Sequence, residues 1–147
     1  MFKKILVAVD GSAASDLAAQ EAVQLAKEQH AQLRVVHVVD EVSFNWPDVG
    51  DFEEYIAAFR ASGRKLLDKA EADARAAGVV VETKLLEVET LGHRIAELIT
   101  AEADSWPADL IVIGTHGRRG VNRLLLGSVA EGVARIAGKP VLLIRAH

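Results

Sequence analysis

The residues best suited to chemistry lie in one glycine-rich segment, from Gly114 to Ser128. Its pattern is Gly-x2-Gly, nine further residues, and then Gly127-Ser128. Glycine permits positive φ and a close approach of the backbone, so that peptide N–H groups can face an anion. Ser128 is expected to open a helix, whose N-terminus carries roughly half a positive charge. These features favour a polyphosphate ligand, and three arginines add basic side chains nearby: Arg118, Arg119 and Arg123.

The glycine-rich segment differs from two well-known phosphate-binding loops. A Walker A loop needs Gly-x4-Gly-Lys followed by Ser or Thr. The nearest match, from Gly132 to Gly138-Lys139, has the wrong spacing and the wrong following residue. The Gly-x-Gly-x-x-Gly fingerprint of dinucleotide-binding proteins is also absent from the sequence. The segment therefore indicates a phosphate site of another kind.

Five short apolar runs have the composition of β-strands. Most of these runs are nearly continuous rather than alternating in polarity. Continuous runs are typical of strands that are covered on both faces, and therefore of parallel sheets. The expected strands are Ile5–Val9, Leu33–Val39, Val79–Leu86, Leu110–Ile113 and Val141–Ile144.

Helical patterns alternate with these strands, at Ser12–Gln29, Asp51–Ala77, Thr90–Ala103 and Ser128–Ala137. The second of them stops at Gly78, which is a C-cap signal, and Ser62-Gly63 predicts a weak point in its middle. Loops are expected at Asp40–Gly50 and Asp104–Pro107. The alternation predicts one α/β domain over residues 1–147, an open five-stranded parallel sheet with helices on both faces.

The expected sheet also predicts where a ligand would lie. In open α/β sheets, ligands bind beyond the carboxyl ends of the strands, at the point where the strand order reverses. Three loops have that position here, and they follow Val9, Val38 and Ile113. Asp10 comes directly after the first of these strands, and the glycine-rich segment follows the fourth. Both are therefore candidates for ligand binding.

Several motifs, in order along the chain, resemble those of the universal stress proteins. Lys3–Ser12 is similar to the family's first strand and turn, and His37–Val39 resembles its second strand. Asp109–Arg118 resembles the family's most recognisable segment, and Pro140–Ile144 resembles its ending. The Gly-x2-Gly-x9-Gly-Ser spacing is the signature of the family's ATP-binding branch. The resemblance implies a Rossmann-like fold, similar to that of the adenine nucleotide α-hydrolases, with strand order 3-2-1-4-5.

The resemblance also implies which residues would bind ATP together with Mg²⁺ or Mn²⁺. Asp10 corresponds to a residue that contacts the ribose or a metal ion bound to the phosphates, and the backbone of Val38 corresponds to a reader of the adenine edge. Ala130 stands where the family often has a hydroxyl, so a phosphate would lose one side-chain bond and keep the N–H. The expected cofactor-binding residues are Ala8, Val9, Asp10, Val38, Gly114, His116, Gly117, Arg118, Gly120, Gly127, Ser128, Val129 and Ala130.

Some of these residues also have a structural interpretation. Ser128 and Glu131 have the spacing of a helix-capping box, and the Glu131 carboxylate would repel a nearby phosphate. Asp10 could instead initiate the helix that follows it. His37 lies in a strand and is expected to be a hydrogen-bonded core histidine. His116 is expected to contact solvent or phosphate rather than to catalyse a reaction.

The composition of the chain excludes several classes of protein. The 147 residues include no cysteine, which excludes disulfide frameworks and cysteine-type zinc sites and is compatible with the cytoplasmic location that we expect. The formal charge of −4 lacks the basic surplus of a general nucleic-acid binder. No apolar run approaches the roughly 18 residues that span a bilayer. We therefore expect neither nucleic acid nor a membrane as a partner.

Three functions remain open. The first is a module that binds ATP and acts in stress response or signalling; the resemblance implies a homodimer, and the apolar last strand, Val141–Ile144, is an edge suited to pairing. The second is a slow ATPase, in which the arginines would stabilise charge, although no residue stands out to orient the attacking water. The third is an interaction protein that binds no nucleotide, which the glycine spacing disfavours.

Overall fold

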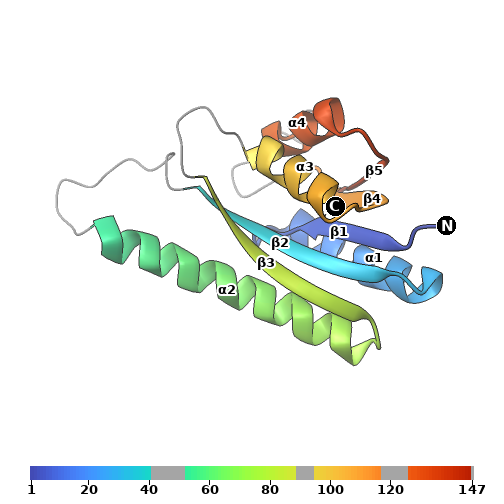
Figure 1. Ribbon diagram of the computed structural model, residues 1–147. Helices are drawn as coiled ribbons and strands as arrows, with labels where there is room; N and C mark the ends of the chain where they lie inside the picture. The colour runs from blue at the N-terminus through green and yellow to red at the C-terminus, as the bar shows by residue number, and fades with distance from the viewer. Residues whose placement is uncertain (41–51, 89–94, 117–125, 147) are drawn as a thin grey trace.

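The computed structural model describes residues 1–40, 52–88, 95–116 and 126–146. A parallel sheet of five strands runs through the molecule in the order β3-β2-β1-β4-β5 (Figure 1). The α/β class, the five parallel strands and their order are thereby confirmed. The strands are β1 (Lys4–Ala8), β2 (Gln32–Asp40), β3 (Val80–Val88), β4 (Leu110–Gly114) and β5 (Val141–Ile144).

Helices cover both faces of the sheet, as the sequence predicts. On one face lie α1 (Ala13–Gln29) and α2 (Phe52–Ala76). On the other face lie α3 (Ile95–Ser105) and α4 (Ser128–Ile136). None of the helices in the described part of the chain is long and apolar enough to cross a membrane.

Each face of the sheet has its own hydrophobic core. Successive side chains of a strand point to opposite faces, so β1 buries Ile5 and Val7 on the side of α1 and α2 and buries Leu6 on the side of α3 and α4. This burial on both sides explains why the central strands are continuous apolar runs. The helix α1 meets the sheet through small side chains one turn apart, which let its backbone lie close to the strands: Ala18, Ala22 and Ala26.

The helix α2 is continuous through Ser62-Gly63, where the sequence predicts a weak point. Gly63 is buried, and a Cβ atom there would lie 2.5 Å from Cδ2 of His37. The glycine is therefore explained by close packing against the sheet rather than by a break in the helix. After the helix, Gly78 has φ +80° and its N–H donates to the carbonyl of Arg75 at 3.0 Å, which confirms the predicted C-cap.

The end of α3 differs from the prediction. Helix continues to Ser105, so the first half of the expected loop Asp104–Pro107 is helical. Trp106 is only 7% exposed and packs into the core that α3 shares with α4, which draws the chain inward at this point. The ammonium group of Lys139 also donates to the carbonyl of Ala103 at 3.0 Å and satisfies one of the last carbonyls of the helix.

Asp109 ties the start of β4 to the start of β1. Its Oδ2 accepts hydrogen bonds from the N–H groups of Lys3 and Lys4, at 2.9 and 3.0 Å. These two backbone bonds lower the pKa of Asp109 below its ordinary value of 3.8, with a smaller contribution from the Lys139 charge. A lowered pKa means that folding favours the ionised carboxyl. The resulting stability is present above about pH 4 and is lost as the pH falls through the folded-state pKa.

We expect Asp109→Asn to lower the urea midpoint of unfolding at pH 7, because the neutral amide accepts weaker bonds than a carboxylate. The difference from wild type should shrink as the pH falls below about 4 and through the lowered folded-state pKa, where the wild-type carboxyl becomes protonated. Urea titrations at pH 7, 4 and 3 measure this. Asp68→Asn, at an exposed position of α2, serves as the control. A difference that stays constant across this range would contradict the role given to the charge.

Candidate functional site

The strands β1 and β4 are neighbours at the centre of the sheet, and the chain leaves them in opposite directions. After β1 it goes through α1 to β2 on one side, and after β4 it goes through α4 to β5 on the other side. A crevice forms where two such connections diverge, at the carboxyl ends of the strands. The structure thus places the end of β1, followed by Val9 and Asp10, beside the strand that ends at Gly114, as the sequence predicts.

A tight turn links β1 to α1 and fixes Asp10. The Oδ1 atom of Asp10 accepts from the N–H of Ser12 at 2.9 Å, and the N–H of Asp10 donates to Oγ of Ser15 at 2.8 Å. Ser12 is the N-cap of α1, since its Oγ accepts from the N–H of Ser15 at 3.2 Å. Asp10 therefore stabilises the turn that precedes the helix, and Ser12, not Asp10, is the N-cap. Its second oxygen, Oδ2, is bonded by no described residue.

The end of β4 connects β5 and the start of α4 to this turn. The N–H of Thr115 donates to the carbonyl of Ile144 in β5 at 2.8 Å, and the Thr115 carbonyl accepts from the N–H of Gly127 at 2.7 Å. The hydroxyl of Ser12 donates to the carbonyl of His116 at 3.3 Å. The starts of α1 and α4 are thus held beside the same strand end.

Gly114 has a packing reason for being glycine. A Cβ atom at this position would lie 2.9 Å from both the carbonyl carbon and Cβ of Ala14, and 3.0 Å from the nitrogen of Ser15. The first turn of α1 therefore packs directly against the last residue of β4. A glycine that the sequence indicates as a phosphate ligand also lets α1 begin at the crevice.

The start of α4 corrects one prediction. Gly127, and not Ser128, is the N-cap residue, so the expected capping box is not formed. The Glu131 carboxylate pairs instead with Arg135, one turn further along the helix, at 3.2 Å. Glycine has no side chain with which to satisfy the first amides of the helix. Among the described residues, none accepts a hydrogen bond from the three amides that follow, those of Ser128, Val129 and Ala130.

The strand β2 extends beyond β1 toward the crevice. The pairing of β1 with β2 ends at Ala8 and Val36, with one further bond from the Val9 N–H to the Val36 carbonyl at 2.9 Å. The pairing of β2 with β3 continues as far as Asp40, which therefore belongs to the strand and not to the expected loop. Backbone groups in a strand alternate in direction, so Val38 turns its N–H and C=O to the same side as Val36. That side faces the crevice.

The candidate residues that the structure describes therefore lie around the carboxyl ends of the strands. Three candidates, Gly117, Arg118 and Gly120, lie outside the described residues. Ala130 is 2% exposed and packs in the core between α3 and α4, which explains a methyl group at this position. In the described part of the chain, no three His, Asp or Glu side chains gather to hold a metal ion.

Two polar residues that organise the crevice were missed by the sequence reasoning. Ser15 and Thr115 are 3% and 7% exposed, and each bonds a neighbouring backbone group. A signal for Ser15 exists, because serines three residues apart at a helix start are typical of capping turns. Thr115 has no such local signal, since its backbone partners, Ile144 and Gly127, lie in β5 and at the start of α4, whereas its hydroxyl lies 3.1 Å from Nδ1 of the neighbouring His116.

Comparison with known proteins identifies the family. The sequence model of the universal stress protein family matches residues 1–145. The chain belongs to the universal stress protein family. It is 38% identical over 146 residues to a universal stress protein of Methanocaldococcus jannaschii, a match that covers 99% of this chain and 83% of the relative.

Solved structures of universal stress proteins share the fold. A crystal structure from Burkholderia pseudomallei superimposes with a TM-score of 0.80 at 40% identity, and the match covers 98% of this chain and 96% of that one. A universal stress protein of Archaeoglobus fulgidus, solved in complex with dAMP, superimposes with a TM-score of 0.68 at 29% identity and 97% coverage of both chains. The fold of this chain is therefore the Rossmann-like fold of the family.

Proposed function

We propose that this universal stress protein binds ATP, with Mg²⁺ or Mn²⁺, in the crevice between β1 and β4, and acts as a nucleotide-dependent module in stress response or signalling. The observation that carries the proposal is the N-terminus of α4, where the amides of Ser128, Val129 and Ala130 have no partner among the described residues and Gly127 has no side chain that could cap them. Such a helix end binds phosphate through its N–H groups and its dipole. The dAMP complex of the Archaeoglobus relative supports an adenine nucleotide as the ligand.

The phosphates would lie against α4 and the base against β2. Gly114 and His116, at the end of β4, would border the phosphates, and we assign Gly117, Arg118 and Gly120 to the same group from their place in the glycine spacing. The positive charge of Arg118 would attract the phosphates together with the dipole of α4.

The backbone of Val38 suits adenine. An N–H and a C=O side by side can donate to a ring nitrogen of adenine and accept from its amino group. Guanine carries an oxygen where adenine has the amino group, so the carbonyl of Val38 would face another acceptor. Ala8 and Val9, at the end of β1, would border the base. Adenine is therefore preferred.

Asp10 is the residue that we assign to the metal ion or the ribose. One carboxylate oxygen is used by the turn, and Oδ2 is bonded by no described residue. Mg²⁺ is usually held by one or two carboxylates together with phosphate oxygens and water, so a single aspartate is sufficient beside a bound triphosphate.

Two other functions compete with this one. A slow ATPase would need a residue that orients water as well as the charge of the arginines. Release of phosphate under saturating ATP distinguishes it from a binding module. An interaction protein without nucleotide would show no ATP binding at all. We place the protein in the cytoplasm, with which a cysteine-free chain is compatible.

Thermal unfolding with and without ATP·Mg²⁺ tests the proposal. A ligand at about 100 times its Kd stabilises by roughly 2.7 kcal/mol, and each kcal/mol moves the Tm of a domain near this size by about 2–4 °C. We therefore expect the Tm to rise by about 5–10 °C with ATP and by less with GTP at the same concentration. If ATP, ADP and AMP all leave the Tm unchanged, an interaction protein that binds no nucleotide is favoured.

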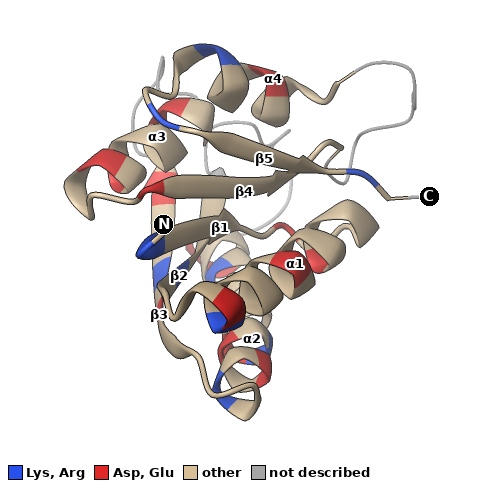
Figure 2. Cartoon of the chain, turned by 90° about the vertical axis from the view of Figure 1, so that its right-hand side faces the viewer, with Lys and Arg blue, Asp and Glu red and all other residues tan. Residues whose placement is uncertain are grey.

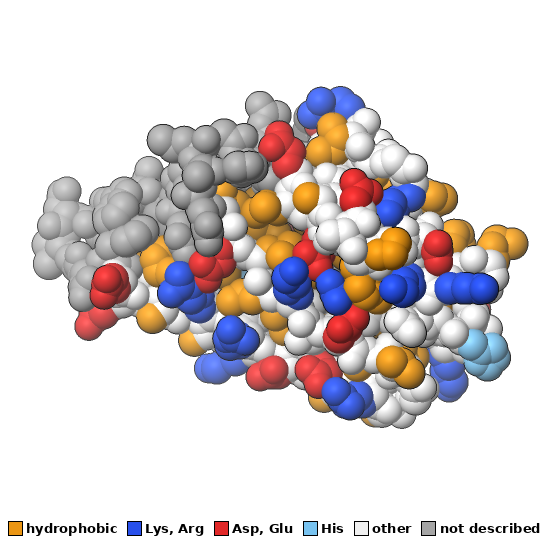
Figure 3. Space-filling model, in the orientation of Figure 1, with side chains coloured by type: hydrophobic (Ala, Val, Ile, Leu, Met, Phe, Trp, Pro, Cys, Tyr) orange, Lys and Arg blue, Asp and Glu red, His pale blue; other side chains and the backbone are white. Residues whose placement is uncertain are grey.

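We further propose that two copies pair through β5. This edge strand is apolar, Leu142 and Leu143 are 37% and 36% exposed, and Figure 2 shows no charged residue within it. The opposite edge strand, β3, carries Glu82 and Lys84, and Figure 3 shows acidic and basic side chains interspersed over the face that holds β3 and α2. Charged side chains protect an edge from pairing, whereas an apolar edge invites it. A homodimer through β5 follows.

A further inference from the structure

His37 connects β2 to the end of β1 through its side chain. Its Nδ1 lies 2.7 Å from the carbonyl oxygen of Val9. A carbonyl oxygen only accepts, so Nδ1 carries the hydrogen and donates it. The sequence predicts a hydrogen-bonded core histidine at this position. The structure shows that its partner is Val9, the residue immediately before Asp10.

The helix α2 leaves room for this imidazole. A Cβ atom at Gly63 would lie 2.5 Å from Cδ2 and 3.1 Å from Nε2 of His37, and 2.9 Å from Cδ1 of Leu85. Glycine is the least favourable residue after proline inside a helix. Gly63 nevertheless occupies a position of α2 at which a side chain would crowd the ring against the sheet.

The peptide unit between Val9 and Asp10 is held by a hydrogen bond at each end. The carbonyl of Val9 accepts from His37, and the N–H of Asp10, in the same peptide, donates to Oγ of Ser15. With both ends of the peptide held, its plane cannot rotate freely. The direction in which the Asp10 carboxylate leaves the backbone is thereby set.

We propose that His37 is a positioning residue of the nucleotide site, which orients Asp10 through the Val9 carbonyl without itself touching the ligand. The inference rests on the proposed function, because Asp10 is the residue assigned to the metal ion or the ribose. The side chains of His37 and Val38 point to opposite faces of the sheet, since they are neighbours in a strand. His37 therefore acts from the side of α2, behind the strand whose backbone would face the base.

Two substitutions separate the hydrogen bond from the packing. His37→Leu fills the space without a donor, and His37→Asn places an amide N–H near the position of Nδ1. Calorimetry gives the Kd for ATP·Mg²⁺, and hydrogen exchange of the Asp10 amide, without nucleotide, reports the order of the peptide. We expect His37→Leu to raise both the Kd and the exchange rate by about tenfold, as for the loss of one neutral hydrogen bond. His37→Asn should restore most of both.

Gly63→Ala provides an independent perturbation that keeps the imidazole in the chain. Its methyl group would crowd the ring, so ATP binding should weaken in the same direction as in His37→Leu. Ser62→Ala, at the exposed neighbouring position, is the matched control and should bind ATP as wild type does.

The outcomes separate this inference from the proposed function. A variant His37→Leu that loses thermal stability but keeps the wild-type Kd overturns the positioning role, because a purely structural residue behaves in that way. If wild type does not bind ATP at all, the proposed function fails, and the exchange measurement still decides the role of His37. If the hydrogen exchange rate of the Asp10 amide is unchanged in both His37→Leu and Gly63→Ala, the positioning role of His37 is overturned.

Discussion

Replacing Gly127 with aspartate is expected to abolish the stabilisation by ATP·Mg²⁺ while the free protein stays as stable as wild type or becomes slightly more stable. Gly127 is the N-cap of α4 with φ −62° and ψ 155°, an extended conformation that aspartate adopts without strain. The new carboxylate would accept from the amides of Val129 or Ala130, which gains a few tenths of a kcal/mol over glycine. It would also place a negative charge where we assign the phosphates.

Opposite effects on stability and on binding make this a strict test. In a thermal melt, the rise of about 5–10 °C expected for wild type should fall below about 1 °C in Gly127→Asp, whereas the Tm without nucleotide should not decrease. Gly138→Asp introduces the same charge just beyond the other end of α4, where a Cβ atom meets nothing within 4 Å. That control should keep the nucleotide shift.

A full nucleotide shift in Gly127→Asp would mean that the phosphates do not lie at the start of α4. The same result would remove the observation on which the proposed function depends. A loss of stability without nucleotide would show instead that Gly127 is needed for folding, for which its extended conformation gives no reason.

The central strands could be predicted because each must satisfy one simple requirement, and the edge strand β5 because its residues are apolar although they are partly exposed. A central parallel strand is buried on both faces, so its sequence is a run of apolar residues with polar residues at the ends. Val141–Ile144 was predicted at the residues that the structure shows, and Leu110–Ile113 was one residue short. The strand order came from the resemblance to the family and not from the runs themselves.

The start of α4 could not be predicted from local pattern alone. Ser128 and Glu131 have the residue types and the spacing of a capping box. The helix nevertheless begins after Gly127, whose N–H is bonded by the carbonyl of Thr115, 12 positions earlier in the chain. A tertiary bond of this kind fixes which residue is the N-cap, and no window of a few residues contains it.

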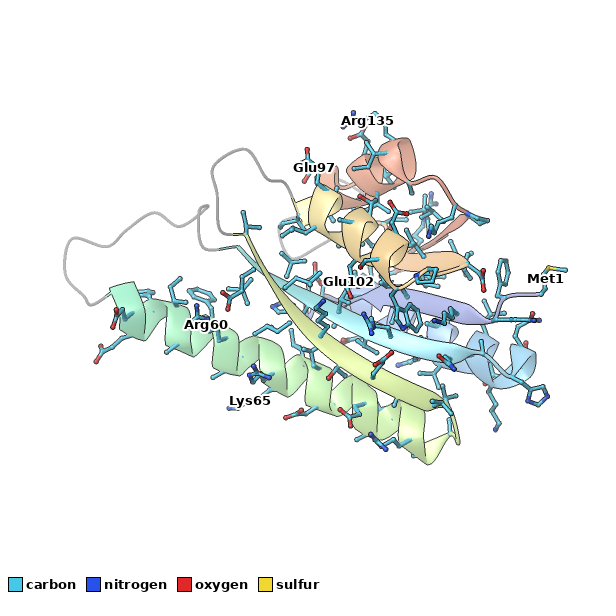
Figure 4. The ribbon with its side chains drawn as sticks, in the orientation of Figure 1. Met1, Arg60, Lys65, Glu97, Glu102 and Arg135 are labelled. Atoms are coloured by element: carbon cyan, nitrogen blue, oxygen red, sulfur yellow. The ribbon has the colours of Figure 1, made fainter. Side chains whose placement is uncertain are left out.

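The burial of the Glu102 carboxylate could not be predicted from the sequence either. Its side chain, 5% exposed, pairs with Arg34 of β2 and lies 3.0 Å from Nζ of Lys84 in β3 (Figure 4). The three residues are far apart along the chain, and an acid in a helix is ordinarily expected at the surface. Two basic partners compensate for the loss of hydration, which is the condition under which a carboxylate can be buried.

The second large effect is expected at β5, where Leu143→Lys should convert the proposed dimer into a monomer. Two copies that pair through a short edge strand are related by a twofold axis that passes through it. One substitution therefore places two like charges close together and removes two apolar side chains from the interface. We expect the dissociation constant to rise by at least about 100-fold, which corresponds to about 2.7 kcal/mol.

The opposite edge of the sheet supplies the matched control. Val80 in β3 is 70% exposed, so Val80→Lys adds the same charge to the edge strand that already carries Glu82 and Lys84. Sedimentation velocity across micromolar concentrations should give the mass of two chains for wild type and Val80→Lys, and the mass of one chain for Leu143→Lys. If Leu143→Lys stays dimeric and Val80→Lys does not, the pairing uses β3. The N–H of Thr115 donates to the last residue of β5, so a change in β5 could also disturb the crevice. A thermal melt of Leu143→Lys with ATP tests this. If the site is complete within one chain, ATP should still raise the Tm of the monomer.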